Sequence, residues 1–243
     1  MDDLVEWNFA LAEKYFYNNH LIINEASHVW KYWHLNFSRS QYYMLIEKAM
    51  KNGARIDSVG LQFHIFCDRE KEKDMAEHYY SAENIYRVLD QYAKLNKPIQ
   101  LTEITIPAYS DDAEDEQIQA EIMENLYKIW FSHDSVEAAI YWNLTDGYAA
   151  FAPRGDMNAG ENYYRGGLLR FDMSKKPAYK VIKNLFENVY RTNLELTTDE
   201  QGRSDFRGFY GKYELEITLE NGESINKEID LRKKCKNSFA ITL

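Results

Sequence analysis

Glu103 is the residue of this sequence that is best placed to do chemistry. It lies near the end of a short apolar run, Ile99 to Thr105, which follows Pro98. The length of this run and its Ile, Leu and Thr content predict a buried strand. At the carboxyl end of a strand in an α/β barrel, a carboxylate is placed to act as a nucleophile or as a general acid or base. The alternative is a structural glutamate that pairs with a nearby Arg or Lys.

Three further predicted strands carry polar or aromatic side chains at or just beyond their ends. They are Leu21 to Glu25 with Asn24 and Glu25, Ile56 to His64 with Gln62 and His64, and Val136 to Leu144 with Trp142 and then Asp146. In an α/β barrel such strand ends project catalytic groups at one face. We therefore expect these side chains to surround Glu103.

The elements between these strands indicate how the strands are arranged. Helices are predicted at residues 4–16, 40–51, 81–95, from an acidic loop (111–116) to Phe131, and at 177–190, with a charged loop before Ser81. Strands that start about every 35 to 43 residues and alternate with helices are typical of βα units in a parallel sheet. A complete eight-unit barrel needs about 250 residues. The four units here therefore predict about half of a barrel, with two unpaired edge strands that invite association.

The pattern changes beyond Arg191. Tyr213 to Glu220, the turn Asn221-Gly222, and Ser224 to Leu231 predict a β-hairpin, and residues 194–197 and 239–243 are predicted as further strands. We expect a partial barrel at residues 1–191 and a small antiparallel, β-sandwich-like module at residues 192–243. The module would serve either as a passive stabilising domain or as a sugar-binding appendage.

Composition excludes several classes of function. The formal net charge is −10 with a pI near 5.2, and no Lys/Arg-rich run stands out, so a nucleic-acid partner is not expected. Aromatic residues make up 15% of the chain, and such rings are suited to stacking on sugars as well as to core packing. Cys67 and Cys235 fit no metal-ligand or redox spacing. We therefore expect neither a metal site nor a cofactor.

The sequence also lacks signals for a membrane. It contains no apolar run of about 18 residues. The first residues, Met1 to Leu4, are acidic and show no signal peptide. We therefore expect no membrane partner, and the compartment stays open.

The four strand ends together resemble the C-terminal half of a glycoside hydrolase family 10 β-1,4-xylanase. The motifs that carry the resemblance are Ile56 to His64 (IDSVGLQFH) for the sixth strand, Leu101-Thr102-Glu103 for the seventh, Tyr141 to Asp146 (YWNLTD) for the eighth, and Leu168 to Asp172 with Lys176 to Tyr179 for the closing segment. The resemblance covers about residues 4–190. It implies strands 5 to 8 of a TIM barrel, a retaining hydrolysis of xylan or a related β-glycan, and a secreted protein.

The resemblance also implies which residues act. Glu103 would attack the anomeric carbon, and His64 would keep it ionised and oriented, because a nearby proton donor favours the charged form. Gln62 and His64 would face the sugar, and Trp142 would stack on it; the alternatives are a structural histidine and a tryptophan that packs in the barrel. Weaker candidates for binding sugar hydroxyls lie at strand ends or in loops: Asn24, Tyr109, Asp146 and Tyr148.

Two departures from the family pattern matter. Leu21 to Glu25 resembles the fifth strand, where Asn-Asp is usual and Asn24-Glu25 stands here. By this alignment, the acid/base glutamate of the fourth strand lies upstream of Met1. Glu25 is the only obvious substitute acid in the chain, although a structural hydrogen bond suits it better. Thr105 also stands where many members carry Asp.

Three hypotheses follow. The missing half of the barrel comes from an N-terminal region or another chain and gives an active enzyme. Alternatively, the chain is a non-catalytic carbohydrate-binding remnant of a xylanase. In the third hypothesis, two copies of the chain form a homodimer in which each supplies half of a closed barrel.

Overall fold

The computed structural model describes residues 3–25, 29–31 and 40–242, which fall into two compact units, Met1–Ile182 and Lys183–Leu243. The units divide inside the last helix of the first unit, before the boundary expected after Arg191. The sequence also predicts a loop from Ala26 to Ser38, most of which lies outside the described residues.

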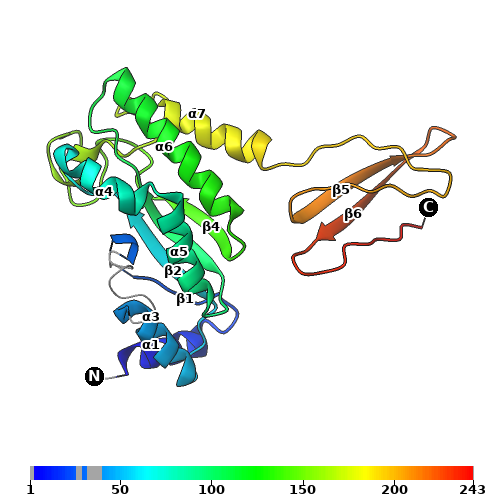
Figure 1. Ribbon diagram of the computed structural model, residues 1–243, viewed down its shortest axis with the longest axis horizontal. Helices are drawn as coiled ribbons and strands as arrows, with labels where there is room; N and C mark the ends of the chain where they lie inside the picture. Colours follow the sequence, from blue (N-terminus) through cyan, green and yellow to red (C-terminus); the bar gives the residue numbers. More distant parts are fainter. Residues whose placement is uncertain (1–2, 26–28, 32–39, 243) are drawn as a thin grey trace. The chain divides into compact units, whose positions relative to one another are not determined.

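The first unit contains a four-stranded, fully parallel sheet in the order β1 (Ile22–Ile23), β2 (Ser58–His64), β3 (Ile99–Thr105), β4 (Val136–Tyr141). Sequence order and spatial order are the same, as in successive βα units of a barrel. Figure 1 shows helices α5 and α6 lying along one face of the sheet. This arrangement agrees with the α/β fold that the strand rhythm predicted.

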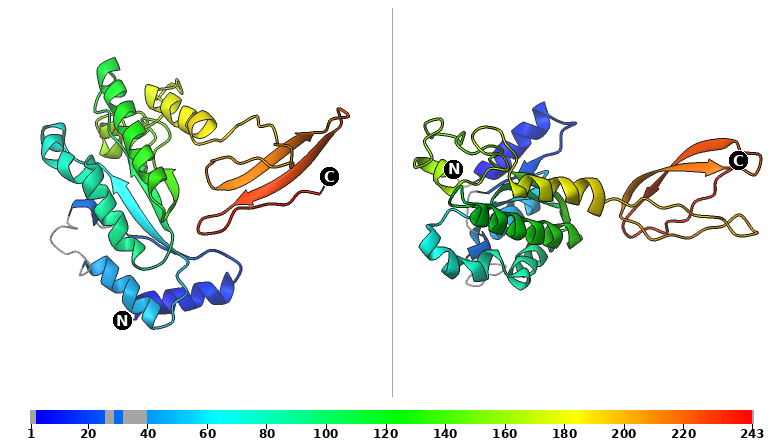
Figure 2. Two further views of the ribbon diagram at one scale, coloured as in Figure 1. Left: turned by 45° about the vertical axis from the view of Figure 1, so that its right-hand side comes forward. Right: turned by 90° about the horizontal axis from the view of Figure 1, so that it is seen from above.

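The helices of this unit follow the strands in turn. Their bounds are α1 Leu4–Tyr15, α3 Gln41–Lys51, α4 Glu72–Tyr79, α5 Ala82–Ala93, α6 Ala113–Ser132 and α7 Pro177–Asn184, with short turns η2 Arg69–Lys71 and η3 Gly160–Tyr164. A π-helical turn, η4 Leu185–Val189, continues α7 in the second unit. Two views at one scale show the same helices around the sheet (Figure 2). No helix in the described part of the chain is long and apolar enough to cross a membrane.

The core lies between the sheet and these helices. On β2, Val59, Leu61 and Phe63 are fully buried and alternate with the polar side of the strand. Burial of each such side chain stabilises the fold by about 1.5–3 kcal/mol. Phe63 contacts the rings of Trp30 and Trp130 edge-on, with centroids 5.0 and 4.9 Å away. This face of the sheet is therefore fixed, and the other face is left to polar side chains.

Several predicted elements were wrong in detail. The strand expected at 21–25 is only Ile22–Ile23, and the strand expected to reach Leu144 ends at Tyr141. The charged loop before Ser81 contains helix α4, whose Tyr79 is buried against Phe63. The expected acidic loop is mostly helix, because α6 begins at Ala113, and two carboxylates of its first turn, Asp115 and Glu116, are buried in ion pairs with arginines.

The second unit contains the predicted hairpin, β5 (Gly211–Thr218) and β6 (Ser224–Leu231), paired from Gly211↔Leu231 to Thr218↔Ser224. Gly222 has a φ of +84° at the turn, a conformation that favours glycine. Residues 194–197 and the described part of 239–243 form no strand. Leu194 and Leu196 are each about half exposed, so little burial favours a strand there.

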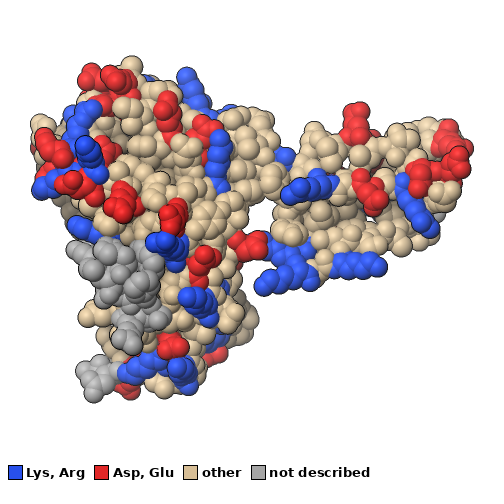
Figure 3. All heavy atoms as spheres, viewed as in Figure 1, with Lys and Arg blue, Asp and Glu red and all other residues tan. Residues whose placement is uncertain are grey.

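Charged side chains are spread over both units. Figure 3 shows Lys and Arg interspersed with Asp and Glu on the visible face. Among the described residues, no group of three or more His, Cys, Asp or Glu side chains is placed to hold a metal ion.

Candidate active site

Glu103 lies on β3 with its carboxylate directed at side chains from β2 and from the end of β1. Its Oε1 accepts from Gln62 Nε2 at 2.9 Å, and its Oε2 lies 3.1 Å from His64 Nε2. Asn24 Nδ2 makes a longer contact of 3.4 Å with Oε1. The Glu103 side chain keeps 20% of its surface exposed. The structure thus brings four predicted site residues together around one partly exposed carboxylate.

An irregularity in β3 directs Glu103 to this side of the sheet. The register pairs Leu61 with Leu101 but Gln62 with Glu103, so one extra residue, Thr102, enters the strand. Leu101 and Ile104, three positions apart, are both fully buried. Thr102 and Glu103 therefore face the polar side in succession. Such β-bulges are frequent beside active sites, where they change the direction of a side chain.

Because Gly60 has no side chain, two side chains from the strands on either side of β2 contact each other above it. Thr102 Oγ1 donates to Asn24 Oδ1 at 2.7 Å, although these residues belong to the third and first strands of the sheet. A Cβ atom on Gly60 would lie 2.7 Å from that Asn24 oxygen and 2.9 Å from Thr102 Cγ2. The hydrogen bond fixes the amide of Asn24, so its NH2 group points toward Glu103.

His64 is held on several sides. Its Nδ1 lies 2.9 Å from Thr105 Oγ1, so a tautomer with the proton on Nε2 accepts from Thr105 and donates to Glu103. Its ring stacks on Phe66 at 4.6 Å and meets the Trp142 ring nearly perpendicularly at 5.9 Å. The side chain is 12% exposed. His64 is therefore oriented for one donor role toward Glu103.

Trp142 follows β4 and is 42% exposed. Its indole N–H donates to Glu161 Oε2 at 2.8 Å, and Asn143 Nδ2 donates to the same oxygen at 2.9 Å. The ring forms a wall beside His64. Such a wall is suited to stacking on a sugar, and this role stays a prediction.

Glu25 lies next to the site but is directed into the fold. It is 6% exposed, and its Oε1 accepts the backbone N–H of Gln62 at 2.9 Å. This is the structural hydrogen bond that the sequence favoured over a role as substitute acid. Through it, Glu25 holds the strand that carries Gln62 and His64.

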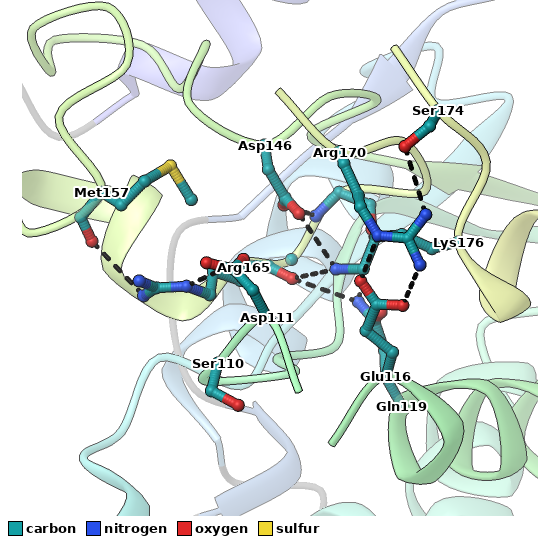
Figure 4. Close-up of polar contacts among 12 residues, drawn as sticks. Ser110, Asp111, Glu116, Gln119, Asp146, Met157, Arg165, Arg170, Ser174 and Lys176 are labelled. Atoms are coloured by element: carbon teal, nitrogen blue, oxygen red, sulfur yellow. Dashed lines mark hydrogen bonds and ion pairs between the residues drawn. The ribbon is translucent and has the colours of Figure 1, made fainter. Parts of the chain in front are cut away.

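Asp146 belongs to a different, buried cluster, drawn in Figure 4. Its carboxylate accepts from Lys176 Nζ at 3.0 Å and from the backbone N–H of Gly167 at 2.7 Å, and the Asp146 and Lys176 side chains are 3% and 1% exposed. Burial lowers the pKa of Lys176, and the Asp146 carboxylate opposes that shift. Both carboxylate oxygens are buried and bonded internally, which favours a structural role for Asp146 over the predicted contact with a sugar hydroxyl.

Two other weak candidates also have partners outside the Glu103 cluster. Tyr148 stacks on Phe171 at 5.3 Å, and its hydroxyl accepts from Arg154 at 2.6 Å. The hydroxyl of Tyr109 lies 3.3 Å from Cys67 Sγ, and burial raises the pKa of that phenol. Neither has a contact that joins it to Glu103, so their roles toward a sugar stay predictions.

Sequence reasoning missed three side chains of the site: Thr102, Phe66 and Glu161. Phe66 lies two positions after His64, on the same side of the chain if the strand continues, and this spacing was the available signal. Glu161 lies about twenty residues after Trp142 in a loop, and nothing in its spacing pointed to that ring.

The arrangement combines a carboxylate with fixed donors and an aromatic wall at the carboxyl ends of parallel strands. The donors leave Glu103 accessible from one side, which suits attack on an electrophilic carbon. Residues 2–185 match the family model described as glycosyl hydrolase family 10.

Solved structures that are similar to this chain include xylanases. Xylanase 10B from Thermotoga maritima is 24% identical with a TM-score of 0.55, and the match covers 76% of this chain and 52% of that one. Xylanase 10B from Thermotoga petrophila RKU-1, solved in complex with xylobiose, is 22% identical with a TM-score of 0.54 over the same shares. The chain therefore spans about half the length of the structures it resembles.

One curated relative is named as a regulatory protein and not as a xylanase. The anti-sigma-I factor RsgI6 of Acetivibrio thermocellus is 27% identical over 226 residues, which cover 90% of this chain and 24% of that protein. The match is longer than the first unit, which has only 182 of the 243 residues. The match therefore extends into the second unit.

Proposed function

The chain belongs to glycosyl hydrolase family 10, and from this membership we propose that it forms the C-terminal half of a retaining glycoside hydrolase. Its substrate is xylan or a related β-glycan. Glu103 is the nucleophile, Gln62 and His64 orient it, and Trp142 stacks on the sugar.

The observation that carries this proposal is the set of donors around Glu103. Three side chains from two other strand ends converge on one carboxylate that remains partly exposed. The structural alternative for Glu103 was an ion pair with an Arg or Lys, whereas its partners among the described residues are two side-chain amides and an imidazole. Donors of this kind position a nucleophile and leave its second side open to a substrate.

A retaining mechanism needs a second carboxyl group about 5–5.5 Å from the first, to protonate the leaving oxygen. The hydrogen bond of Glu25 to Gln62 makes Glu25 a poor source of that proton. We therefore propose that the acid/base comes from the other half of the barrel, contributed by a preceding segment or by another chain. The edge strands β1 and β4 each have one neighbour among the described strands, and a second half would pair with both.

The test is to measure the release of reducing sugar from xylan in two assemblies. The chain alone should show almost no turnover, and the chain joined to four complementary βα units should be active. In the active assembly, Glu103→Gln should reduce turnover by about three orders of magnitude. Full turnover by the chain alone, or by the Glu103→Gln assembly, contradicts the proposal. A monomer at micromolar concentration, seen by sedimentation, excludes the half-barrel homodimer.

The name of the curated relative favours a second candidate function, in a regulatory protein. That relative is an anti-sigma factor, and it matches this chain beyond the family 10 region. In this version, the first unit binds a glycan without cleaving it. Binding of xylotetraose would then survive Glu103→Ala, and no assembly would show turnover.

A further inference from the structure

Glu161 is fixed in the loop that follows β4, independently of the ring that it contacts. It lies in η3, next to Asn162, which is 2% exposed. The Asn162 side chain accepts from the N–H of Ala149 at 2.9 Å and donates to the carbonyls of Pro153 and Asp156. These bonds tie three points of the loop to one buried amide. The Glu161 carboxylate is therefore presented from a rigid turn.

The loop is held a second time on the other side of η3. Arg165 donates to the carbonyls of Met157 and Tyr163 and pairs with Asp111 at 3.2 Å (Figure 4). Lys176 Nζ also donates to the carbonyl of Arg165 at 2.8 Å. The buried cluster around Asp146 thus secures the turn that carries Glu161.

Trp142 has a single hydrogen-bond donor, and that donor is directed at Glu161. Trp142 is 42% exposed and lies just beyond the edge strand β4, so packing alone leaves the plane of its indole weakly determined. The 2.8 Å bond to a carboxylate is charge-assisted, a class about twice as strong as neutral hydrogen bonds. Asn143 donates to the same oxygen and brings the strand end to the loop.

The orientation of Trp142 reaches the candidate nucleophile through His64. The edge-to-face contact of Trp142 and His64 has centroids 5.9 Å apart and an interplanar angle of 78°. Phe66 stacks on the same imidazole, with ring centroids 4.6 Å apart. The Nε2 atom of the same ring lies 3.1 Å from Glu103. A change in the indole plane would therefore open one side of the imidazole.

We infer that Glu161 is a positioning residue, which sets the plane of Trp142 and, through that ring, the imidazole of His64. The hydrogen bonds described for Glu161 are to Trp142 and Asn143 and not to Glu103. Its effect on sugar binding rests on the proposed function, in which Trp142 stacks on a xylosyl unit. Its effect on the orientation of the Trp142 and His64 rings does not rest on the proposed function.

The experiment compares three variants of the full chain: Glu161→Ala, Glu161→Gln and, as a matched control, Glu124→Ala. Glu124 is an exposed carboxylate on α6 that pairs with Lys128. A glutamine at position 161 still offers an oxygen to the indole N–H, so it should rescue the positioning. The readouts are the ¹H–¹⁵N signal of the Trp142 indole, assigned by its loss in Trp142→Phe, and the ¹⁵N signals of the His64 ring.

We expect the indole and imidazole signals to move in Glu161→Ala and to stay near their wild-type positions in Glu161→Gln and Glu124→Ala. Unmoved signals in Glu161→Ala overturn the inference, as does a Glu161→Gln spectrum that matches Glu161→Ala. These outcomes do not depend on sugar binding.

Titration with xylotetraose separates the inference from the proposed function. Glu161→Ala should bind about tenfold more weakly than the wild type, because one hydrogen bond to a charged group is lost. Wild-type binding that Glu161→Ala leaves unchanged overturns the link to the sugar. Absence of wild-type binding contradicts the proposed function of this chain, while the ring signals still decide the positioning role.

Discussion

Two polar clusters of the first unit each surround one carboxylate but differ in the groups that bond it and in its access to solvent. Around Glu103, the donors are amides and an imidazole near the carboxyl ends of the strands, and the Glu103 side chain is 20% exposed. Around Asp146, the carboxylate is 3% exposed, and its partners are a buried lysine and a backbone N–H. The sequence placed both residues at or just beyond strand ends, Glu103 as the candidate nucleophile and Asp146 as a weaker candidate for binding a sugar hydroxyl.

The difference shows what separates a site from a structural brace. The Asp146 cluster is closed, because Lys176 also donates to the carbonyl of Arg165 and so ties the loop to the closing segment. The Glu103 cluster is held by its donors but still presents a carboxylate to solvent. A closed cluster contributes mainly to the free energy of unfolding, and an open one mainly to binding and chemistry. Substitutions in the two clusters can break this comparison.

The largest expected effect is at Lys176. Lys176→Met leaves the Asp146 carboxylate buried without its cation, which should lower the free energy of unfolding by about 3–5 kcal/mol. Glu103→Gln should lower it by less than about 1 kcal/mol, because a glutamine fits the same exposed position. Urea denaturation followed by circular dichroism measures both. Lys183→Met, which removes an exposed lysine paired with Glu187, is the matched control. Equal stability of Lys176→Met and Lys183→Met would contradict a structural role for the closed cluster.

The second largest effect on stability is expected for a substitution of Gly60. The added methyl group of Gly60→Ala would overlap Asn24 Oδ1 and Thr102 Cγ2, so we expect a loss of about 1–3 kcal/mol. In the background of Asn24→Ala, the closest of these contacts is removed, and the same substitution should cost less. A double-mutant cycle measured by denaturation tests this coupling. Additive effects would mean that Gly60 does not serve to bring Asn24 and Thr102 together.

A third prediction concerns the pH dependence of stability at another buried carboxylate, Asp115. Hydrogen bonds from Arg69 lower the pKa of Asp115, burial opposes that shift, and Ser110 adds to it. A carboxyl group with a lowered folded pKa contributes stability that is present above its unfolded value of about 3.9 and is lost as the pH falls through the folded value. Arg69→Met should therefore cost about 1 kcal/mol at pH 7 and progressively less below pH 4.

The measurement is the free energy of unfolding from pH 7 to pH 3 for the wild type and for Arg69→Met. Arg87→Met, at an exposed arginine that pairs with Glu83 on α5, serves as the control. A constant difference between wild type and Arg69→Met across this range would show that Asp115 does not titrate through its arginine.

Much of the fold could be predicted because long periodic segments carry strong signals. The four parallel strands and the hairpin of the second unit came from alternation, spacing and turn residues. Helix α4 was missed because its charged surface dominates its sequence, although Tyr79 is buried on its inner side. The sequence predicts a strand near residue 194, but Leu194 and Leu196 are exposed, and this segment pairs with no strand in the described part of the chain.

The site was harder to predict than the sheet, for a geometric reason. Strand ends indicated Glu103, Gln62 and His64, which do meet. The extra residue in β3 that turns Thr102 and Glu103 to the same side leaves no mark in composition or alternation. Whether a strand-end carboxylate faces solvent or a buried lysine also depends on the path of a loop, as Asp146 and Lys176 show.

The smallest expected effect on stability is at Thr102, and it sharpens the open side of the comparison. Thr102→Val keeps the shape of the side chain but removes the hydroxyl that donates to Asn24 Oδ1. Asn24 is exposed, so water can replace the lost donor, and the free energy of unfolding should fall by less than about 1 kcal/mol. The freed amide can then turn away from Glu103, and affinity for xylotetraose should fall several-fold. Thr102→Ser keeps the hydroxyl and is the control for both measurements. A Thr102→Val chain that loses stability but not affinity would make Thr102 a brace like Lys176, and the contrast between the two clusters would then not hold at this position.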